Sequence, residues 1–273
     1  MTDLGAVPSA NDLADLASRA ARRAGAYLRD HFGRAVDVRH KSGYFDIVTP
    51  HDLKAERLIT ETLLAGWPDS TIVGEESGWS GDGRVRWYID PIDGTTNFVA
   101  GLPLYAVSIG AEIDGSLRAG CVYLPQQDEV FVAGDGPTTL NGQAVACSSA
   151  SGDDEAVALI GYPYEGRSSG LDEQALTKRL TDQFAAVRRL GSAALHLAYI
   201  AAGRGDVASE LIAKPWDVAA GFHLVQRAGG ALHLAGEFGT PGSSVSWREA
   251  PRYVATGANF DFASSSIAGA LIP

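Results

Sequence analysis

The sequence is short of several features that would place it in a special environment. It has two cysteines, Cys121 and Cys147, too few for a disulfide framework in a chain of 273 residues and without the spacing of metal ligands. It has no run of roughly 18 apolar residues that could span a membrane, and its first residues lack the basic start and apolar block of a signal peptide. We therefore expect a cytoplasmic protein in which both cysteines are core residues or bystanders.

Positive charge is also scarce. The chain carries 22 Lys and Arg residues against 33 Asp and Glu residues, a net charge of −11. Proteins that bind nucleic acids need clustered basic side chains facing the phosphates, so we expect neither nucleic acid nor a membrane as a partner. An acidic protein can still bind an anionic substrate if its carboxylates first bind divalent cations, which invert the local field.

Apolar periodicity predicts helices and short strands in two blocks. The 45% apolar content supports a full core. Ser9 and Asp12 form a capping pair for the first helix, and Gly33 ends it. The predicted helices are residues 11–32, 52–64, 171–184, 192–201 and 217–227. The predicted strands are residues 70–73, 87–89, 106–113, 116–123, 129–133, 157–160, 231–234 and 253–256. A stretch rich in Ser, Gly and Asp at residues 148–154 predicts a boundary between the blocks.

The densest polar motif is DPIDGTTNF, residues 90–98. Asp90, at a predicted strand end, and Asp93, in the turn after Pro91, can point at one spot and offer the hard oxygen ligands that magnesium prefers. Gly94 lets the backbone approach a ligand closely. If Thr95 opens a helix, the amides of that N-terminus form a seat for phosphate. Metal and phosphate sites would then adjoin.

Taken singly, these acids have a plain interpretation, because Asp-Pro and Asp-Gly are common turn dipeptides. Further acids nearby favour a ligand-binding role over a role in turns alone. Glu75 and Glu76 follow the predicted strand at residues 70–73, and Asp217 opens a late helix. Open sheets gather ligand-binding groups at the carboxyl ends of their strands. We therefore expect four or five acids to converge on one site.

Several strings of the sequence resemble the signature segments of inositol monophosphatases. These are GEES (residues 74–77), DPIDGTTNF and WDVAAG (residues 216–221). KSGYFDIVTPHD (residues 41–52) resembles the family's N-terminal element, and RLGSAALHLAYIAAGRGDVASE (residues 189–210) resembles its substrate-side segment. Several long motifs in the family's order are far more specific than one short pattern.

This resemblance implies an architecture. It is the mixed α/β (α+β) layered α/β/α/β/α sandwich of the sugar phosphatases. Residues 1–147 would form an N-terminal α+β subdomain with most metal ligands. Residues 148–273 would form a C-terminal α/β subdomain that completes the metal site and the substrate pocket. Family members are usually homodimers, so a homodimer is expected.

The resemblance also implies a magnesium-dependent, lithium-sensitive phosphomonoesterase with two or three Mg²⁺ ions per active site. Glu75, Asp90 and the main-chain carbonyl of Ile92 would hold the first ion. Asp90, Asp93 and Asp217 would hold the second, so that Asp90 bridges the two. A third, loosely held ion at Glu75 is described for relatives.

Catalytic and substrate-binding roles follow from the same resemblance. A metal-bound water polarised by Glu75 and Thr95 would attack phosphorus in line, while Asp52 hydrogen-bonds to Thr95. Lys41 would lie on a loop that helps to organise the metal and the nucleophile. The residues implied to contact the substrate are Gly94 and Thr95, through amides that seat the phosphate, and Asp93, Ala193 and Glu210, which meet its hydroxyl groups.

Some of these residues keep a structural alternative. Asp52 also forms a helix-capping pair with Thr49. Lys41 and Glu210 could be ordinary surface residues, and Glu76 could be a partner of the ligands or a solvated loop acid. The sequence alone leaves these alternatives open.

The most favoured substrate is inositol 1-phosphate. The alternatives within the superfamily are fructose-1,6-bisphosphatase, histidinol-phosphate phosphatase and nucleotide 3′-phosphatase or NADP phosphatase activities. Residue 96 is Thr, where some histidinol-phosphate enzymes have Lys, which disfavours that alternative. Residues 161–174 lie where relatives vary most and where the outer face of the substrate is contacted. A non-catalytic, partner-binding protein is the minor alternative.

Overall fold

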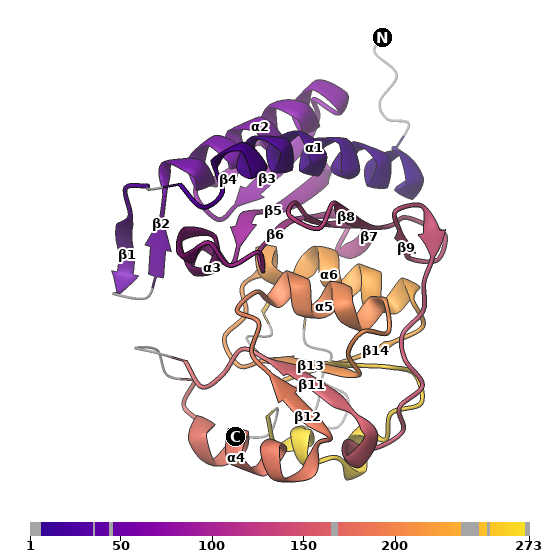
Figure 1. The fold of residues 1–273 in the computed structure, drawn as a ribbon. Coiled ribbons are helices and arrows are strands. Elements are labelled where there is room, and N and C mark those ends of the chain that lie inside the picture. The colour runs from indigo at the N-terminus through magenta and orange to yellow at the C-terminus, as the bar shows by residue number, and fades with distance from the viewer. Residues whose placement is uncertain are drawn as a thin grey trace.

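The chain stacks helices and sheets in alternating layers (Figure 1). A computed structural model describes residues 7–34, 36–43, 46–164, 169–235, 246–249 and 252–270. The helices are α1 (Ala10–His31), α2 (Pro50–Gly66), α3 (Thr95–Ala100), α4 (Glu173–Gln183), α5 (Ala193–Ala201) and α6 (Pro215–Arg227). The strands are β1 (Arg39–Gly43), β2 (Asp46–Val48), β3 (Ser70–Gly74), β4 (Gly78–Ser80), β5 (Val85–Asp93), β6 (Ala106–Ile113), β7 (Ser116–Leu124), β8 (Glu129–Ala133), β9 (Thr139–Leu140), β10 (Gln143–Ala144), β11 (Val157–Ile160), β12 (Ala186–Arg188), β13 (Val207–Glu210), β14 (Ala231–Leu234) and β15 (Tyr253–Thr256).

Two large sheets carry the fold. The first has eight strands in the order β10-β9-β8-β7-β6-β5-β3-β4, and only β3 and β5 in it run parallel. The second has five strands in the order β12-β11-β13-β15-β14, with β11 parallel to both β12 and β13. β1 and β2 form a separate antiparallel hairpin. Each of these parallel pairs has carboxyl ends at which functional side chains can gather.

Helices α1 and α2 cover the outer face of the first sheet (Figure 1). The Leu and Ala stripe of α1 is buried, and the helix starts with the predicted capping box: Ser9 Oγ accepts from the amide of Asp12 at 3.1 Å. Thr49 and Asp52 form the same motif at the start of α2. These reciprocal bonds satisfy amides that a helix start otherwise leaves unpaired.

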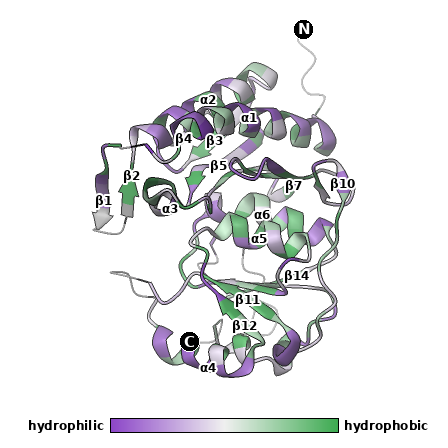
Figure 2. Cartoon of the chain, viewed as in Figure 1, coloured by the Kyte–Doolittle hydropathy of each residue, from purple (hydrophilic) through white to green (hydrophobic). Residues whose placement is uncertain are grey.

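The middle layer consists of α5 and α6, which lie between the two sheets and are mainly apolar (Figure 2). Two glycines let α6 approach the first sheet closely. A Cβ on Gly110 would lie 2.6 Å from Ala219 Cβ, and one on Gly120 would lie 2.5 Å from the Ala220 carbonyl oxygen. Side chains at these positions would clash, so the N-terminus of α6 is set at a fixed distance from β6 and β7.

The predicted fold class, a layered α/β/α/β/α sandwich, is confirmed. Strands 106–113, 129–133, 157–160, 231–234 and 253–256 have the predicted bounds. The helix predicted from residue 171 begins at Glu173, because Asp172 caps it and accepts from the amide of Ala175 at 3.0 Å. The predicted subdomain boundary at residues 147/148 falls between β10 and β11; the division into subdomains stays a prediction.

Two further expectations concern composition. Cys121 is buried in the core beneath α1, and Cys147 packs beside the core around α5 and α6, so both behave as small apolar residues. Within the ranges that the structure describes, no helix has both the length and the apolar character that crossing a bilayer requires.

Candidate active site

Two acids of the predicted site lie side by side on neighbouring parallel strands. Asp90, which was predicted to follow a strand ending at residue 89, lies within β5, because pairing with β6 continues to Asp93. β3 and β5 run parallel, with Gly74 opposite Ile89, and the amide of Glu75 donates to the Ile89 carbonyl at 3.0 Å. Glu75 directly follows β3, and Asp90 directly follows Ile89 on β5. Their carboxylates therefore leave the same edge of the sheet, as expected for a ligand site in a sheet with parallel strands.

A bulge in β5 brings Asp93 beside Asp90. The two residues are three positions apart on β5, but their partners on β6 are two positions apart. The extra residue bends the strand, and Pro91 lies inside the bulge, where its missing N–H costs no regular ladder bond. The amide of Ile92 donates to Asp90 Oδ1 at 3.0 Å and fixes that carboxylate.

A glycine then turns the chain from β5 into α3. Gly94 has a φ of +99°, and a Cβ there would lie 3.0 Å from the Leu104 carbonyl oxygen and 3.2 Å from that of Gly191. No side chain caps the helix that begins at Thr95. Both the left-handed backbone and the close approach thus require glycine at this position, and α3 starts directly beside Asp93.

The fourth acid arrives from the middle layer. Pro215 occupies the first turn of α6, where its fixed φ suits a helix start. Asp217 belongs to the same turn, and its Oδ2 accepts from the amide of Lys214 at 2.8 Å. Ser108 of β6 donates to the Trp216 carbonyl at 3.2 Å. The close contact between α6 and the first sheet thereby carries Asp217 to the acids of β5.

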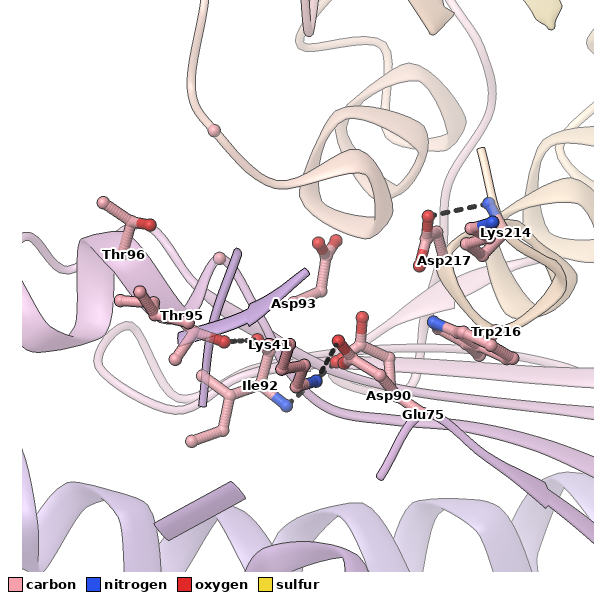
Figure 3. Close-up of a pocket in the computed structure, with 13 residues that line it drawn as sticks. Lys41, Glu75, Asp90, Ile92, Asp93, Thr95, Thr96, Lys214, Trp216 and Asp217 are labelled. Atoms are coloured by element: carbon pink, nitrogen blue, oxygen red, sulfur yellow. Dashed lines mark hydrogen bonds and ion pairs between the residues drawn. The ribbon is translucent and has the colours of Figure 1, made fainter. Parts of the chain in front are cut away.

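These acids line a common cavity of about 320 Å³. Figure 3 shows the carboxylates of Glu75, Asp90, Asp93 and Asp217 facing the same space, with Thr95 on the side of α3. The cavity is lined by Lys41, Ile47, Glu75, Asp90, Ile92, Asp93, Gly94, Thr95, Thr96, Gly191, Lys214, Trp216 and Asp217. The structure therefore brings together all five predicted metal-binding residues.

The buried carboxylates are electrostatically unbalanced. Burial raises the pKa of Asp90 well above its usual range, and the charges on Glu75, Asp93 and Asp217 raise it further. Burial, opposed by hydrogen bonds from Ser192 and Ala194, raises the pKa of Asp93 to about 7. Burial and the charge on Asp93 likewise raise the pKa of Asp217. Like charges in a site of low polarity favour their neutral forms unless a cation compensates them.

One cation of the chain already contacts this group. Lys41 Nζ lies 2.9 Å from Glu75 Oε1 and 2.5 Å from Glu76 Oε1. Burial opposes the charge on Lys41, but the bond with Glu76 and the charge on Glu75 prevail and raise the lysine pKa. Burial and Glu75 raise the pKa of Glu76 to about 7. Glu76, whose side chain is 6% exposed, is therefore a partner of Lys41 and not a solvated loop acid, while Lys41, although exposed, is paired with two acids of the site.

Comparison with known proteins decides the family. The sequence profile of the inositol monophosphatase family matches residues 10–263. The chain belongs to the inositol monophosphatase family.

Individual relatives agree with this membership. Nus factor SuhB of Escherichia coli (strain K12) is 40% identical over 223 residues, which are 80% of this chain and 83% of that protein. Fructose-1,6-bisphosphatase/inositol-1-monophosphatase of Thermotoga maritima is 35% identical over 222 residues, 81% and 84% of the two chains. The crystal structure of the extragenic suppressor protein SuhB from Bartonella henselae matches with a TM-score of 0.81 and 32% identity, over 90% of this chain and 94% of that one. The inositol monophosphatase family is thus represented here by proteins named for a phosphatase and by proteins named as Nus factors.

Asp52, which the resemblance to inositol monophosphatases placed near the nucleophile, makes both of the contacts considered for it, with Thr49 and with Thr95. Its Oδ2 accepts from the amide and the hydroxyl of Thr49 at 2.8 and 2.7 Å, which caps α2. Its Oδ1 accepts from Thr95 Oγ1 at 3.1 Å. Burial raises the pKa of Asp52, and the bonds from Thr49 and Thr95 oppose that rise. One buried carboxylate therefore ties the start of α2 to the start of α3.

A second cavity, of about 300 Å³, adjoins the first and shares Asp93 and Asp217 with it. Ala193 and Glu210 line this cavity, as expected of substrate contacts. Glu210 is 6% exposed, so its alternative as a surface carboxylate is wrong. Asp93 is anchored on this side, because its Oδ2 accepts from Ser192 Oγ at 2.7 Å and from the amide of Ala194.

The sequence did not single out several residues that shape the two cavities. Ser192 caps α5 and also binds Asp93; its position just before an apolar helical run is the signal for a cap. Glu56 accepts from the amides of Glu76 and Ser77, both at 2.8 Å, and so holds the turn after Glu75. An acid on the apolar face of a predicted helix was the signal for Glu56, because buried charges need partners.

Proposed function

We propose that the protein is a Mg²⁺-dependent phosphomonoesterase that hydrolyses a small polyol phosphate, inositol 1-phosphate foremost, through attack by water. The observation that carries the proposal is the convergence of four carboxylates, from β3, β5 and α6, on one cavity beside the start of α3. Membership of the inositol monophosphatase family supports a phosphatase. The substrate and the metal are the parts that need testing.

The residues present fit magnesium. Carboxylate and carbonyl oxygens are the hard ligands that this ion prefers. Several of them are buried with raised pKa values, so a divalent cation would relieve their mutual repulsion. Lys41 already places an ammonium group on Glu75. In the described part of the chain, no group of three or more His, Cys, Asp or Glu side chains is arranged to hold a metal ion, so the proposed ligand sets require the carboxylates to move together when an ion binds. Protein donors occupy Asp90 Oδ1, Asp93 Oδ2 and Asp217 Oδ2, which leaves their second oxygens for a metal.

Two ligand sets are proposed. Glu75, Asp90 and the carbonyl of Ile92 would hold one Mg²⁺, and Asp90, Asp93 and Asp217 would hold another. Ile92 O lies 3.0 Å from Thr95 Oγ1 and, even when it accepts that hydroxyl proton, keeps one of its two lone pairs for a metal. When bound, the ions would act as Lewis acids that lower the pKa of water and stabilise the leaving oxygen.

The chain's own groups would orient the attacking water. Thr95 Oγ1 has a single proton and lies within reach of two acceptors, Asp52 Oδ1 at 3.1 Å and Ile92 O at 3.0 Å. Donating that proton to either acceptor leaves the lone pairs of Thr95 to accept from a water molecule. Glu75 faces the same space, so we propose that Thr95 and Glu75 hold the water while Asp52 fixes the direction of the Thr95 hydroxyl.

The substrate would bridge the two cavities. We propose that the amides of Gly94 and Thr95 seat the phosphate in the first cavity, and that Asp93, Ala193 and Glu210 meet hydroxyl groups of the polyol in the second. The shared wall formed by Asp93 and Asp217 puts the phosphate and the polyol within one small molecule's length of each other.

The test is phosphate release, with and without Mg²⁺, from inositol 1-phosphate, fructose 1,6-bisphosphate, histidinol phosphate, adenosine 3′,5′-bisphosphate and NADP. We expect Mg²⁺-dependent release that is fastest from inositol 1-phosphate. Equal or faster release from fructose 1,6-bisphosphate, which the name of the Thermotoga maritima relative makes the main alternative, would reject the substrate assignment. No release from any member of the panel would reject the phosphatase.

A partner-binding role is the second candidate, because the Escherichia coli relative is named a Nus factor. The two roles predict different behaviour of the acid site. A partner that is retained on the protein without Mg²⁺ and is insensitive to phosphate, together with no phosphatase activity, would make binding the main function.

A further inference from the structure

The second cavity contains a small hydrogen-bond network around Glu210. Glu210 ends β13 and Gly161 follows the parallel strand β11; the amide of Gly161 donates to the Ser209 carbonyl at 3.2 Å. A Cβ on Gly161 would lie 1.8 Å from Glu210 Oε2, so only glycine leaves room for this carboxylate. The chain therefore has a built receptacle for the Glu210 side chain at the carboxyl ends of two parallel strands.

Tyr164 closes this receptacle. Its hydroxyl donates to Glu210 Oε2 at 2.6 Å and accepts from the amides of Leu211 and Ile212 at 2.9 and 3.3 Å. A phenol has one proton and two lone pairs, so these bonds use its full capacity. Burial and the charge on Glu210 raise the pKa of Tyr164, which keeps the phenol a donor. Tyr164 can therefore reach a substrate hydroxyl only through Glu210.

His196 of α5 lies beside the other carboxylate oxygen of Glu210, Oε1. Its Nε2 accepts from the amide of Leu190 at 3.2 Å, which leaves the proton on Nδ1, and Nδ1 lies 3.3 Å from Glu210 Oε1. Nδ1 makes no hydrogen bond within the described residues, so Tyr164 holds one of the roughly four lone-pair positions of the carboxylate and the others stay open to a ligand. Those positions can only accept hydrogen bonds.

The charge around the cavity favours the same kind of ligand. Asp93, Glu210 and Asp217 line it, against one base, Arg189, whose Nη2 donates to the Pro163 carbonyl at 2.6 Å. Bound metal ions would compensate Asp93 and Asp217 but not Glu210. A second phosphate placed here would face an uncompensated carboxylate, whereas the hydroxyl groups of a neutral polyol would donate to it.

We propose that Tyr164 is a positioning residue for Glu210: its hydroxyl, held by two main-chain amides, keeps the carboxylate in the second cavity and thereby favours phosphate esters whose polyol hydroxyl groups can donate to it. This inference rests on the proposed phosphatase function and adds to it the residue that sets substrate preference.

The experiment compares kcat and KM for inositol 1-phosphate and for 4-nitrophenyl phosphate, which has no polyol hydroxyls. The full chain is used, with Mg²⁺. Tyr164→Phe removes one hydroxyl. Tyr123→Phe is the matched control, because Tyr123 also donates to a carboxylate at 2.6 Å, that of Asp128, and lines neither cavity.

For Tyr164→Phe we expect KM for inositol 1-phosphate to rise about tenfold, the effect of losing one good hydrogen bond to a charged group, while kcat changes less than about twofold. The preference for inositol 1-phosphate over the aryl phosphate should fall by the same factor, and Tyr123→Phe should leave it unchanged. Equal losses on both substrates, or no change in KM, would overturn the proposal.

A double-mutant cycle separates positioning from a general structural effect. In a Glu210→Ala background, which removes the acceptor, Tyr164→Phe should change KM by less than about twofold, because its action through the carboxylate is already lost. An undiminished effect in that background would contradict the proposal. Gly161→Ala would place a Cβ against the same oxygen, Glu210 Oε2, displace the carboxylate and should also raise KM; it serves as the second variant if Tyr164→Phe fails to fold.

Direct titration with inositol 1-phosphate distinguishes failure of this proposal from failure of the phosphatase. If the wild-type chain binds the ester without hydrolysing it, the phosphatase is rejected, and the Kd values of the same variants decide the role of Tyr164 by the same tenfold criterion. If the wild-type chain neither binds nor hydrolyses the ester, both proposals fall.

Discussion

Asp52→Asn tests whether one carboxylate serves both helix capping and catalysis. Asparagine is nearly isosteric with aspartate, so its carbonyl oxygen can keep the two bonds from Thr49. Its NH₂ group would then face Thr95 Oγ1, which now has to accept instead of donate. The substitution therefore changes the direction of the Thr95 hydroxyl and leaves most of the cap in place.

The expected cost to folding is small. A neutral acceptor makes hydrogen bonds about half as strong as those of a charged acceptor. Removing the negative charge from the first turn of a helix also costs about 0.3–1 kcal/mol, because the carboxylate interacts favourably with the helix dipole. Removing a buried charge offsets part of that loss, since burial raises the pKa of Asp52. We expect a net destabilisation of about 1 kcal/mol or less, which corresponds to roughly 2–4 °C in melting temperature.

The expected cost to activity is much larger. Misplacing a group that orients the nucleophile typically lowers kcat by about 10²-fold or more. Asp12→Asn is the matched control. Asp12 accepts from the amide and hydroxyl of Ser9 in the capping box of α1, which is of the same kind as that of α2, and it lies outside both cavities.

Thermal denaturation and kcat for inositol 1-phosphate are measured on both variants. We expect similar small losses of stability for Asp12→Asn and Asp52→Asn, and a loss of kcat for Asp52→Asn alone. An Asp52→Asn protein that keeps at least half of the wild-type kcat would show that Asp52 is a cap and nothing more. A large drop in melting temperature would show that the cap was not preserved and would refute the reasoning about the asparagine.

Three further predictions concern the metal site and the core. Asp93→Asn should abolish turnover and shrink the rise in melting temperature that Mg²⁺ causes, whereas the exposed Asp69→Asn should change neither; a full thermal shift in Asp93→Asn would remove Asp93 from the ligands. Lithium on the order of tens of millimolar should inhibit phosphate release by competing with a weakly held Mg²⁺. Undiminished activity at that concentration would contradict the proposed second Mg²⁺ site. His223 donates from Nε2 to the Gly134 carbonyl at 3.0 Å, and burial lowers its pKa. The contribution of neutral His223 to the free energy of unfolding is therefore complete above about pH 6.5, the histidine pKa in the unfolded chain. It is lost as the pH falls through the lower pKa of His223 in the folded chain. Denaturant midpoints from pH 8 to 5 should fall less steeply for His223→Gln than for the wild-type chain, and identical slopes would exclude His223 as a cause.

Local patterns were enough to predict the elements that bring the acids together. The capping pair of α1, the apolar stripes of α1, α2 and α6 and the hairpin of β6 and β7 all depend on residues close in sequence. The acids could be located for the same reason, since Glu75 and Asp90 follow β-rich runs directly. Their shared space is now visible in the structure, while the roles assigned to them stay proposals.

The features that the sequence did not predict depend on contacts between segments that are far apart in the chain. β13 has four residues and no alternation, and it is a strand because it lies between β11 and β15. The contact between Ser192 and Asp93 joins positions 99 residues apart. Glu210 was expected at the substrate, but its fit against Gly161 follows from the pairing of two parallel strands, which no local pattern encodes.

The glycines that face α6 bear on how the enzyme exchanges substrate for product. Where Gly110 and Gly120 meet α6, backbone lies against backbone, and few side chains are present whose rotamer changes could accommodate sliding. The separation between Asp217 and the acids of β5 should then stay constant through a catalytic cycle. The parts of the cavity wall that lie outside this contact include Lys41 of β1 and Ile47 of β2. A covalent cross-link between α6 and β6 should therefore leave turnover intact.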